Sequence, residues 1–359
     1  MDALLYAYTA FLALIWLGLV AITLANTLSA KGSKAYSPRR GYAPKALVMV
    51  PCKGTDLTLR DNLLSLKRQR YSNYDVIAIV DSESDPSMQA ILEAGLHHIV
   101  SAKRWPKASG KVRALSTALT RFRGYDAYVV ADSDATFGED WLELLVAPLA
   151  DRRTGVSTAF PYFRPVGGFW SKVKLVWGFV GNGMMESPVT RFAWGGSMAF
   201  RKGFLDAKSF SEFSASVSDD IPITRIAKRK GLGICYVPER VVTVNSNDDF
   251  ARFREWSNRQ AALTILGNRK NLHYGVVLYS ANILLLVSAI ALSVLSNPLL
   301  AVLLLPFAIG AARTYSRAGT SDPALFVAYL MINFIYLANL LHARSMGSIE
   351  WRGTRYSLR

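Results

Sequence analysis

The chain has 359 residues, of which 51% are hydrophobic and 19% are charged, and its net charge is +16. An ordinary soluble domain has roughly 45–50% apolar and about 25% charged residues, so this composition argues against a wholly soluble protein. The length allows one sizeable catalytic domain together with a membrane region. The basic surplus fits a polyphosphate substrate, an anionic lipid surface or nucleic acid, and the positions of the charges must decide among these.

The first predicted element is a transmembrane helix within residues 1–30. Residues 3–28 contain no charged side chain and are long enough to cross about 30 Å of hydrocarbon. A signal peptide is the alternative, but the segment has no basic start and no clear cleavage site. By the positive-inside rule, the basic residues that follow are expected on the cytoplasmic side: Lys31, Lys34, Arg39 and Arg40.

Residues 42–270 are predicted to form the catalytic domain, a layered α/β fold. Amphipathic segments at 57–69 and 110–122 are typical of helices, and each lies between two short apolar runs. These runs have the continuous hydrophobicity of buried parallel strands, and they cover residues 46–50, 76–80 and 127–131. Strands that alternate with helices indicate a sheet with helices packed on it.

The sequence then becomes apolar again, and residues 274–343 are predicted to form a C-terminal transmembrane region. Residues 276–295 and 324–341 are long enough to span a bilayer. Residues 299–312 are shorter and contain Pro306, so they either span or form half of a hairpin.

The basic tail, residues 344–359, creates a conflict of topology. Three spanning segments would put it on the side of the membrane opposite to the catalytic domain. Its basic residues favour the cytoplasmic side, however, and they are Arg344, Arg352, Arg355 and Arg359. One of the three segments is therefore a candidate for lying in the interface.

Asp132 and Asp134 directly follow the apolar run 127–131. Acids two residues apart in an extended chain point to the same side, and α/β folds bind ligands at the carboxyl ends of their strands. A carboxylate there can hold Mg²⁺ or Mn²⁺, which in turn binds diphosphate oxygens. A D-x-D pair alone is often a solvated turn, but its place after a buried strand favours a metal site.

Two further acidic pairs occur at predicted element ends. Asp81 and Asp85 follow the run 76–80, where they either contact a nucleotide or form a turn and helix cap. Asp219 and Asp220 precede a helix predicted over residues 221–230. Acids are favoured at a helix N-terminus in any case, but a carboxylate there could also act as a general base toward an acceptor hydroxyl.

Three other features could contribute to a site. Lys111, within a basic cluster, could reach a diphosphate, although most of that cluster has the character of a solvated surface. Trp194, Gly195 and Gly196 could wall an acceptor pocket, or they could be a tight entry to a strand. Residues 168–185 have tryptophans and aliphatic residues at helical spacing, which fits either an interfacial helix or a core-facing one.

Taken together, these segments resemble glycosyltransferase family 2 and, within that wider group, the ceramide glucosyltransferase-like enzymes. The resemblance covers nearly the whole chain, and the order and spacing of its motifs are more specific than any single motif. The matching segments are VPCKG (50–54), VDSESDP (80–86), GKVRAL (110–115), ADSDA (131–135), WGGSMAF (194–200), SVSDD (216–220), WSNRQ (256–260) and WRGTRY (351–356).

The resemblance implies a glycosyltransferase-A fold that faces the cytosol, and inversion at the anomeric carbon. Asp81 or Asp85 would then contact the nucleotide, with Asp81 preferred, and Lys111 would contact the diphosphate end of the donor. Asp134, with Asp132 beside it, would hold the metal and donor, and Asp220 would be the catalytic base. The diphosphate would be bracketed by Arg259 and Gln260, and the donor site closed by Trp351, Arg352, Arg355 and Tyr356. Trp194, Gly195, Gly196 and Asp219 would lie toward the acceptor.

One motif departs from the family pattern. The Arg-Trp pair that often comes shortly after the position of Gln260 is replaced here by residues 261–264, Ala-Ala-Leu-Thr. Related polymerising synthases use that tryptophan at the acceptor sugar, so its absence argues against a processive polymerase.

The hypothesis favoured by the sequence is a multi-pass membrane hexosyltransferase that uses Mn²⁺ or Mg²⁺ and UDP-glucose or GDP-mannose, with a lipid hydroxyl as acceptor. A polyprenyl phosphate is the alternative acceptor, because its ionised phosphate needs no base. A non-catalytic basic membrane protein is a distant third hypothesis. Nucleic acid is not expected as a partner, because much of the charge lies beside membrane segments or near the proposed diphosphate site.

The metal assignment gives a first prediction. We expect Asp134→Ala to lose the Mn²⁺-dependent part of nucleotide-sugar binding, because one of the two carboxylates after the strand is removed. Titration of UDP, GDP, UDP-glucose and GDP-mannose against the purified protein, with Mn²⁺ and with EDTA, measures this. An unchanged Mn²⁺-dependent affinity in the variant would refute the assignment.

Overall fold

The computed structural model describes residues 2–34, 41–238 and 241–358. The chain divides into two compact units. A helical unit contains Met1–Lys31, Pro165–Gly183 and Asn247–Gly347, and a sheet unit contains Gly32–Arg164, Met184–Ser246 and Ser348–Arg359. The units thus do not follow the linear order of the sequence, and the domain boundaries predicted above stay predictions. Arg39, Arg40 and Arg359, which entered the prediction of topology, lie outside the described residues.

A seven-stranded mixed sheet forms the centre of the sheet unit, in the order β3-β2-β1-β4-β8-β6-β9. Strand β1 pairs in parallel with β2 and with β4, β2 with β3, and β6 with β9, whereas β8 is antiparallel to both of its neighbours. The predicted buried strands are β1, β2 and β4, so the expected α/β fold is confirmed. The strands are β1 (Ala46–Pro51), β2 (Tyr74–Val80), β3 (His97–Val100), β4 (Ala127–Ala131), β6 (Thr154–Ala159), β8 (Ser197–Arg201) and β9 (Gly233–Val237).

Helices flank these strands, and the predicted ones form within one or two residues of their expected bounds. Ser109 caps α4, because its Oγ accepts a hydrogen bond from Val112 N at 3.2 Å. Apolar side chains of α4, α7 and α8 pack with those of β1, β2, β4 and β8 in one continuous core. The helices of this unit are α2 (Leu59–Lys67), α3 (Met88–Glu93), α4 (Gly110–Arg121), α5 (Trp141–Val146), the 3₁₀ helix η1 (Ala147–Ala150), α7 (Ala207–Ser214) and α8 (Asp220–Arg229).

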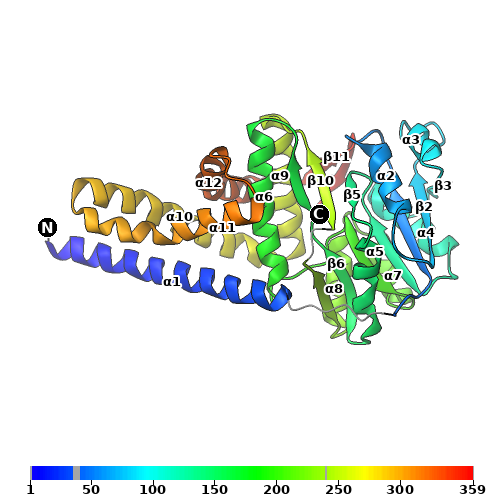
Figure 1. Ribbon diagram of the computed structural model, residues 1–359, viewed down its shortest axis with the longest axis horizontal. Coiled ribbons are helices and arrows are strands. Elements are labelled where there is room, and N and C mark those ends of the chain that lie inside the picture. Colours follow the sequence, from blue (N-terminus) through cyan, green and yellow to red (C-terminus); the bar gives the residue numbers. More distant parts are fainter. Residues whose placement is uncertain (1, 35–40, 239–240, 359) are drawn as a thin grey trace. The chain divides into compact units, whose positions relative to one another are not determined.

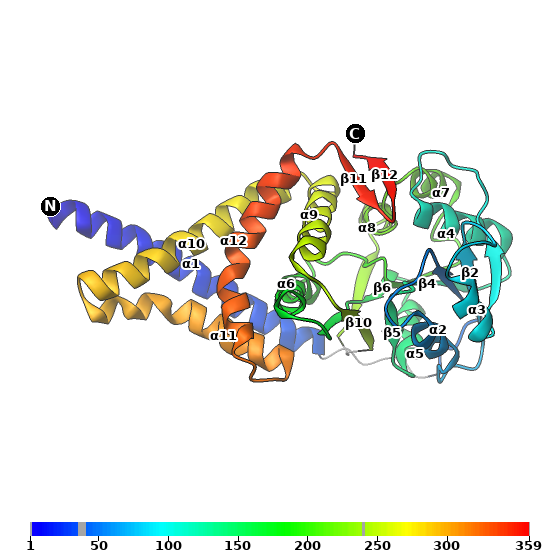
Figure 2. The same cartoon turned by 90° about the horizontal axis from the view of Figure 1, so that it is seen from above.

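Two small sheets complete the strands. One has the order β5-β10-β7, formed by β5 (Ala135–Phe137), β10 (Val242–Ser246) and β7 (Tyr162–Pro165). The other is a hairpin of β11 (Ser348–Trp351) and β12 (Thr354–Ser357), drawn in red in Figure 2. Its two-residue loop has positive φ at both Arg352 (51°) and Gly353 (70°), as a tight hairpin turn of the primed types requires.

The helical unit contains long apolar helices. Within the described residues, four helices are long and apolar enough to cross a membrane: Tyr6–Ser29, Lys270–Leu295, Pro298–Ala318 and Ala324–Ser345. Its elements are α1 (Asp2–Lys34), α6 (Phe169–Glu186, which ends in the sheet unit), α9 (Phe250–Gly267), α10 (Lys270–Leu295), the 3₁₀ helix η2 (Pro298–Leu304), α11 (Leu305–Ala318) and α12 (Ala324–Ser345). Leucines of α1 and α10, both labelled in Figure 1, share a buried cluster with Leu303 and Phe307.

The position of Pro306 explains how the short predicted segment 299–312 can be helical. Pro306 lies at the start of α11, where the backbone N–H that proline lacks would have no intrahelical partner. The proline therefore begins a helix instead of interrupting one. Helix α11 and the preceding η2 together extend the predicted segment 299–312 to Pro298–Ala318.

Helix α6 packs inside the helical unit. Trp177 stacks on Tyr336 of α12 with ring centroids 4.7 Å apart, and the Tyr336 hydroxyl donates to the Trp177 carbonyl at 2.9 Å. Lys174 pairs with Asp248 at 3.0 Å and lies over the Trp256 ring. Of the two interpretations of residues 168–185, these contacts favour the core-facing helix.

The sheet-unit core gives a second prediction. Trp141 is fully buried, and its indole Nε1 donates to Ser197 Oγ at 2.8 Å. We expect Ser197→Ala to destabilise the protein by about 1–3 kcal/mol, because it leaves a buried donor without its acceptor. The thermal midpoint of unfolding in detergent measures the loss, with the exposed Ser211→Ala as control. Equal midpoints for the two variants would contradict the prediction.

Candidate active site

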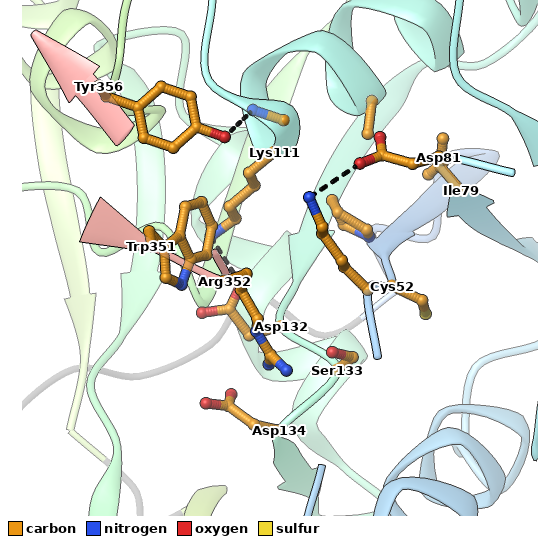
Figure 3. Close-up of a pocket in the computed structure, with 14 residues that line it drawn as sticks. Cys52, Ile79, Asp81, Lys111, Asp132, Ser133, Asp134, Trp351, Arg352 and Tyr356 are labelled. Atoms are coloured by element: carbon orange, nitrogen blue, oxygen red, sulfur yellow. Dashed lines mark hydrogen bonds and ion pairs between the residues drawn. The ribbon is translucent and has the colours of Figure 1, made fainter. Parts of the chain in front are cut away.

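One pocket of the sheet unit collects residues from several of the predicted motifs (Figure 3). It lies at the carboxyl ends of the adjacent strands β1, β2 and β4, beside the first turn of α4, which is where α/β sheets bind ligands. It encloses about 610 Å³, including space open to solvent. Its lining is Pro51, Cys52, Lys53, Ile79, Asp81, Gly110, Lys111, Ala114, Asp132, Ser133, Asp134, Trp351, Arg352 and Tyr356.

Both aspartates of the D-x-D motif line this pocket. Asp132 Oδ1 lies 2.6 Å from the Lys111 ammonium, and Asp134 also lines the pocket. No cluster of three His, Cys, Asp or Glu side chains suitable for a metal occurs among the described residues. Two carboxylates beside an open pocket fit a cation that completes its shell with water and substrate phosphates, which is how Mg²⁺ is usually held.

Lys111 is buried, with 9% of its side chain exposed, and three oxygens surround its ammonium. Besides Asp132, these are Asp219 Oδ2 at 3.1 Å and the Gly195 carbonyl at 3.2 Å. Burial alone would lower the pKa of Lys111, but the Asp132 and Asp219 carboxylates outweigh it, so the pKa is raised and the charge is kept.

The two glycines of the W-G-G motif permit close contacts. A Cβ atom on Gly195 would lie 2.4 Å from Asp219 Oδ2, and one on Gly196 would lie 2.1 Å from the Trp194 ring. Trp194 packs against Phe160, with ring centroids 5.8 Å apart. The motif is thus an entry to β8, and its glycines let an acid and an aromatic ring approach the backbone.

Asp81 and Asp85 differ in their surroundings. Asp81 lines the pocket and pairs with Lys53 at 3.3 Å and with Arg113 at 3.4 Å. Asp85 Oδ1 accepts hydrogen bonds from Gly54 N (2.8 Å), Ser87 N (2.9 Å) and Ser87 Oγ (2.7 Å). Asp85 therefore organises the loop before α3, and Asp81 is the acid of this pair that lines the pocket.

Asp219 and Asp220 lie at the start of α8, outside the set of residues that line the pocket. Asp220 accepts from Ile221 N at 2.7 Å and from the Ser218 hydroxyl. Burial and, second, the neighbouring Asp219 charge raise the pKa of Asp220 to about 6. Burial also raises the pKa of Asp219, although the Lys111 charge opposes this. Asp219 connects the pair to the pocket through its contact with Lys111.

The tail hairpin supplies one wall of the pocket. Figure 3 shows Trp351, Arg352 and Tyr356 on the side opposite Asp81 and Cys52. The Tyr356 hydroxyl accepts from Gly110 N at 3.1 Å, and Arg352 pairs with Asp56. Burial alone would lower the pKa of Arg352, but Asp56, Asp134 and Asp132 raise it, which keeps the guanidinium charged.

Three predicted residues are not among those that line this pocket. Arg355 Nε donates to Ser348 Oγ at 3.0 Å within the hairpin, and Arg355 is not among the lining residues. Arg259 and Gln260 lie on α9 in the helical unit, where Arg259 pairs with Glu255 at 3.5 Å. Their proposed part in diphosphate binding stays a prediction.

The sequence analysis missed Asp56. Its carboxylate accepts from Ser133 Oγ at 2.8 Å and pairs with Arg352, so it joins the loop after β1 to the D-x-D turn and the hairpin. An acid shortly after the first predicted strand was the available signal. Cys52 also lines the pocket, and burial raises the pKa of its thiol to about 12, so it is protonated and unreactive at neutral pH.

A mixed α/β sheet with paired carboxylates at its strand ends, in a chain with apolar helices long enough to span a membrane, is the arrangement that the resemblance to GT-A glycosyltransferases predicts. The chain belongs to glycosyl transferase family 21, whose sequence model matches residues 9–359. The resemblance to glycosyltransferases is therefore confirmed, whereas the label of family 2 is not. No curated protein matches the chain.

The chain is similar to solved structures, of which the mannosyltransferase below supports the fold. A mannosyltransferase from Pyrobaculum calidifontis, solved with GDP-mannose and Mn²⁺, is 19% identical, with a TM-score of 0.53 and coverage of 93% of this chain and 97% of that one. Glucosyl-3-phosphoglycerate synthase from Mycobacterium tuberculosis, in complex with Mn²⁺, UDP and glucosyl-3-phosphoglycerate, is 16% identical, with a TM-score of 0.43 over 65% of this chain and 86% of that one.

The different surroundings of Asp81 and Asp85 give a third prediction. We expect Asp85→Ala to destabilise the protein by about 1–3 kcal/mol, because buried and half-buried donors lose their acceptor. Asp81→Ala should leave stability nearly unchanged, since its ion pairs are partly exposed, and should weaken nucleotide binding instead. Thermal unfolding and nucleotide titration of both variants separate the two effects. The opposite pattern would overturn the assignment.

Proposed function

We propose that this glycosyltransferase moves one hexose, glucose or mannose, from a nucleotide-diphosphate sugar to a lipid hydroxyl group. The proposal rests on one observation. Asp132, Asp134 and residues of the basic hairpin all line one pocket at the carboxyl ends of the strands. Carboxylates that can hold a cation, opposed by an arginine, suit a diphosphate better than an uncharged ligand. The mannosyltransferase of the same fold was solved with a nucleotide sugar and Mn²⁺.

In this proposal the donor lies along the carboxyl ends of β1, β2 and β4. Asp81 binds the nucleoside, and Asp132 and Asp134 hold Mn²⁺ or Mg²⁺. When bound there, such a cation would neutralise the charge that develops on the leaving diphosphate. Arg352 exchanges its contact with Asp56 for a diphosphate oxygen, and Trp351 and Tyr356 cover the donor and exclude water.

The acceptor is proposed to be a lipid because the same chain carries four helices that are apolar and long enough to span a bilayer. A lipid hydroxyl would reach the enzyme from that bilayer. The protein is accordingly proposed to be an integral membrane enzyme whose sheet unit faces the cytoplasm. The basic residues that flank the first helix support that orientation.

Asp220 is the proposed general base. A hydroxyl is a weak nucleophile, so a positioned carboxylate must accept its proton as the oxygen attacks the anomeric carbon. A pKa of about 6 leaves Asp220 mostly ionised at neutral pH and basic enough to take part in proton transfer. A single displacement of this kind inverts the configuration at the anomeric carbon.

The role of Asp220 gives a fourth prediction, which also tests the function. We expect Asp220→Asn to lower kcat for transfer to ceramide or diacylglycerol by roughly 10²–10⁴-fold while the Mn²⁺-dependent affinity for the donor is kept. The wild-type rate should fall as the pH drops through about 6, because Asp220 is then protonated. The capping-residue variant Asp206→Asn on α7 is the matched control.

Stability should follow the opposite trend with pH. Because the folded pKa of Asp220 is raised from 3.8 to about 6, its contribution favours the folded state at low pH and is lost as the pH rises through about 6. Asp220→Asn should remove this part of the pH dependence of the thermal midpoint.

Two outcomes of the transfer assay would overturn parts of the proposal. Transfer to polyprenyl phosphate that survives Asp220→Asn would favour the phosphate acceptor, because an ionised phosphate needs no base. A wild-type protein that binds none of the four nucleotides with Mn²⁺ would refute the donor site.

A further inference from the structure

Lys111 lies where four of the sequence motifs meet. Its own motif begins α4, Asp132 comes from the D-x-D turn after β4, Gly195 from the loop before β8, and Asp219 from the residue before α8. The other three segments are far apart in the sequence, yet each contributes an oxygen within 3.2 Å of the Lys111 ammonium nitrogen.

The number of these contacts matters for what Lys111 can do. An ammonium group has three N–H donors, and three protein oxygens already surround this one. The Asp219 contact is an ion pair, since Asp219 Oδ2 is not aligned for a hydrogen bond with any described residue. A diphosphate oxygen would have to approach an ammonium that three protein oxygens already crowd, on a side chain that is 9% exposed.

We propose that Lys111 is a positioning residue that fixes the donor-side carboxylate of Asp132 and the acceptor-side carboxylate of Asp219 to each other. Asp220, the next residue in the chain, is thereby held in register with the donor pocket. This inference rests on the proposed function for the roles of Asp132 and Asp220. It differs from the role that the family resemblance implies for Lys111, which is contact with the diphosphate.

Gly195 supports this arrangement independently. A Cβ atom at this position would lie 2.4 Å and 2.7 Å from the two carboxylate oxygens of Asp219. Glycine is therefore required there for Asp219 to approach both the backbone and Lys111. The W-G-G motif thus leaves room for the Asp219 carboxylate, which Lys111 also contacts.

Charge balance makes the proposal testable. Removing the ammonium leaves Asp132 and Asp219 without the cation that lies between them, and unpaired buried charge is strongly destabilising. Neutralising Asp219 as well should relieve much of that cost. A lysine that only binds diphosphate would show no such compensation.

The experiment compares Lys111→Met, Asp219→Asn and the double variant. We expect Lys111→Met to lower kcat for transfer to ceramide or diacylglycerol by about 100-fold or more, while the Kd of UDP or GDP with Mn²⁺ changes less than about threefold. The double variant should regain about tenfold in kcat and at least half of the lost thermal midpoint. Lys230→Met is the matched control, because Lys230 also contacts a carboxylate and a carbonyl, those of Asp206 and Phe204.

Gly195→Ala is the second variant, and it keeps Lys111 in place. It should lower kcat with little change in nucleotide Kd, because Asp219 is displaced. The inference is wrong if Lys111→Met weakens the Kd of UDP or GDP as much as it lowers kcat/KM and Asp219→Asn gives no recovery. If the wild type transfers to neither lipid, the proposed function fails, and nucleotide Kd and thermal midpoints still test the inference.

Discussion

A buried ammonium between two carboxylates is the interaction on which the candidate site depends. Lys111 contacts Asp132 at 2.6 Å and Asp219 at 3.1 Å. Charges removed from water must be paired, so the elements that carry these three side chains are held to one geometry. The sheet fixes the end of β4, the core fixes α4 and α8, and the ion pairs join the three ends. These contacts fix Lys111 and Asp132, which line a pocket that opens to solvent.

The wall of the pocket is built differently, from the tail of the chain. The hairpin β11–β12 is attached to the sheet unit by the pair of Arg352 with Asp56 and by the hydrogen bond from Gly110 N to Tyr356. Arg352 and Asp56 are 31% and 10% exposed, so their ion pair is largely shielded from water.

The helical unit is held together by polar contacts between apolar helices. Helices with apolar outer surfaces bury polar groups among themselves, as the stacked rings of Trp177 and Tyr336 and the hydrogen bond between them show. Asn339 of α12 likewise donates to Asn258 at 2.7 Å. Polar contacts inside an apolar bundle specify which helices pack together, because hydrocarbon offers these groups no other partner.

The sequence by itself determined the class of fold, the buried strands and the apolar helices, because these follow from local periodicity and from the length of uncharged runs. It also marked the acids at strand and helix ends as candidates. Only the tertiary structure decided which acids share a site. Asp81 lines the pocket and Asp85 does not, Asp56 contacts both the D-x-D turn and the hairpin, and hairpin residues line the pocket. The physical reason is that such contacts join segments far apart in the sequence, as Arg352 and Asp56 are at a separation of 296 residues, and no local pattern records which strand ends become neighbours in a sheet.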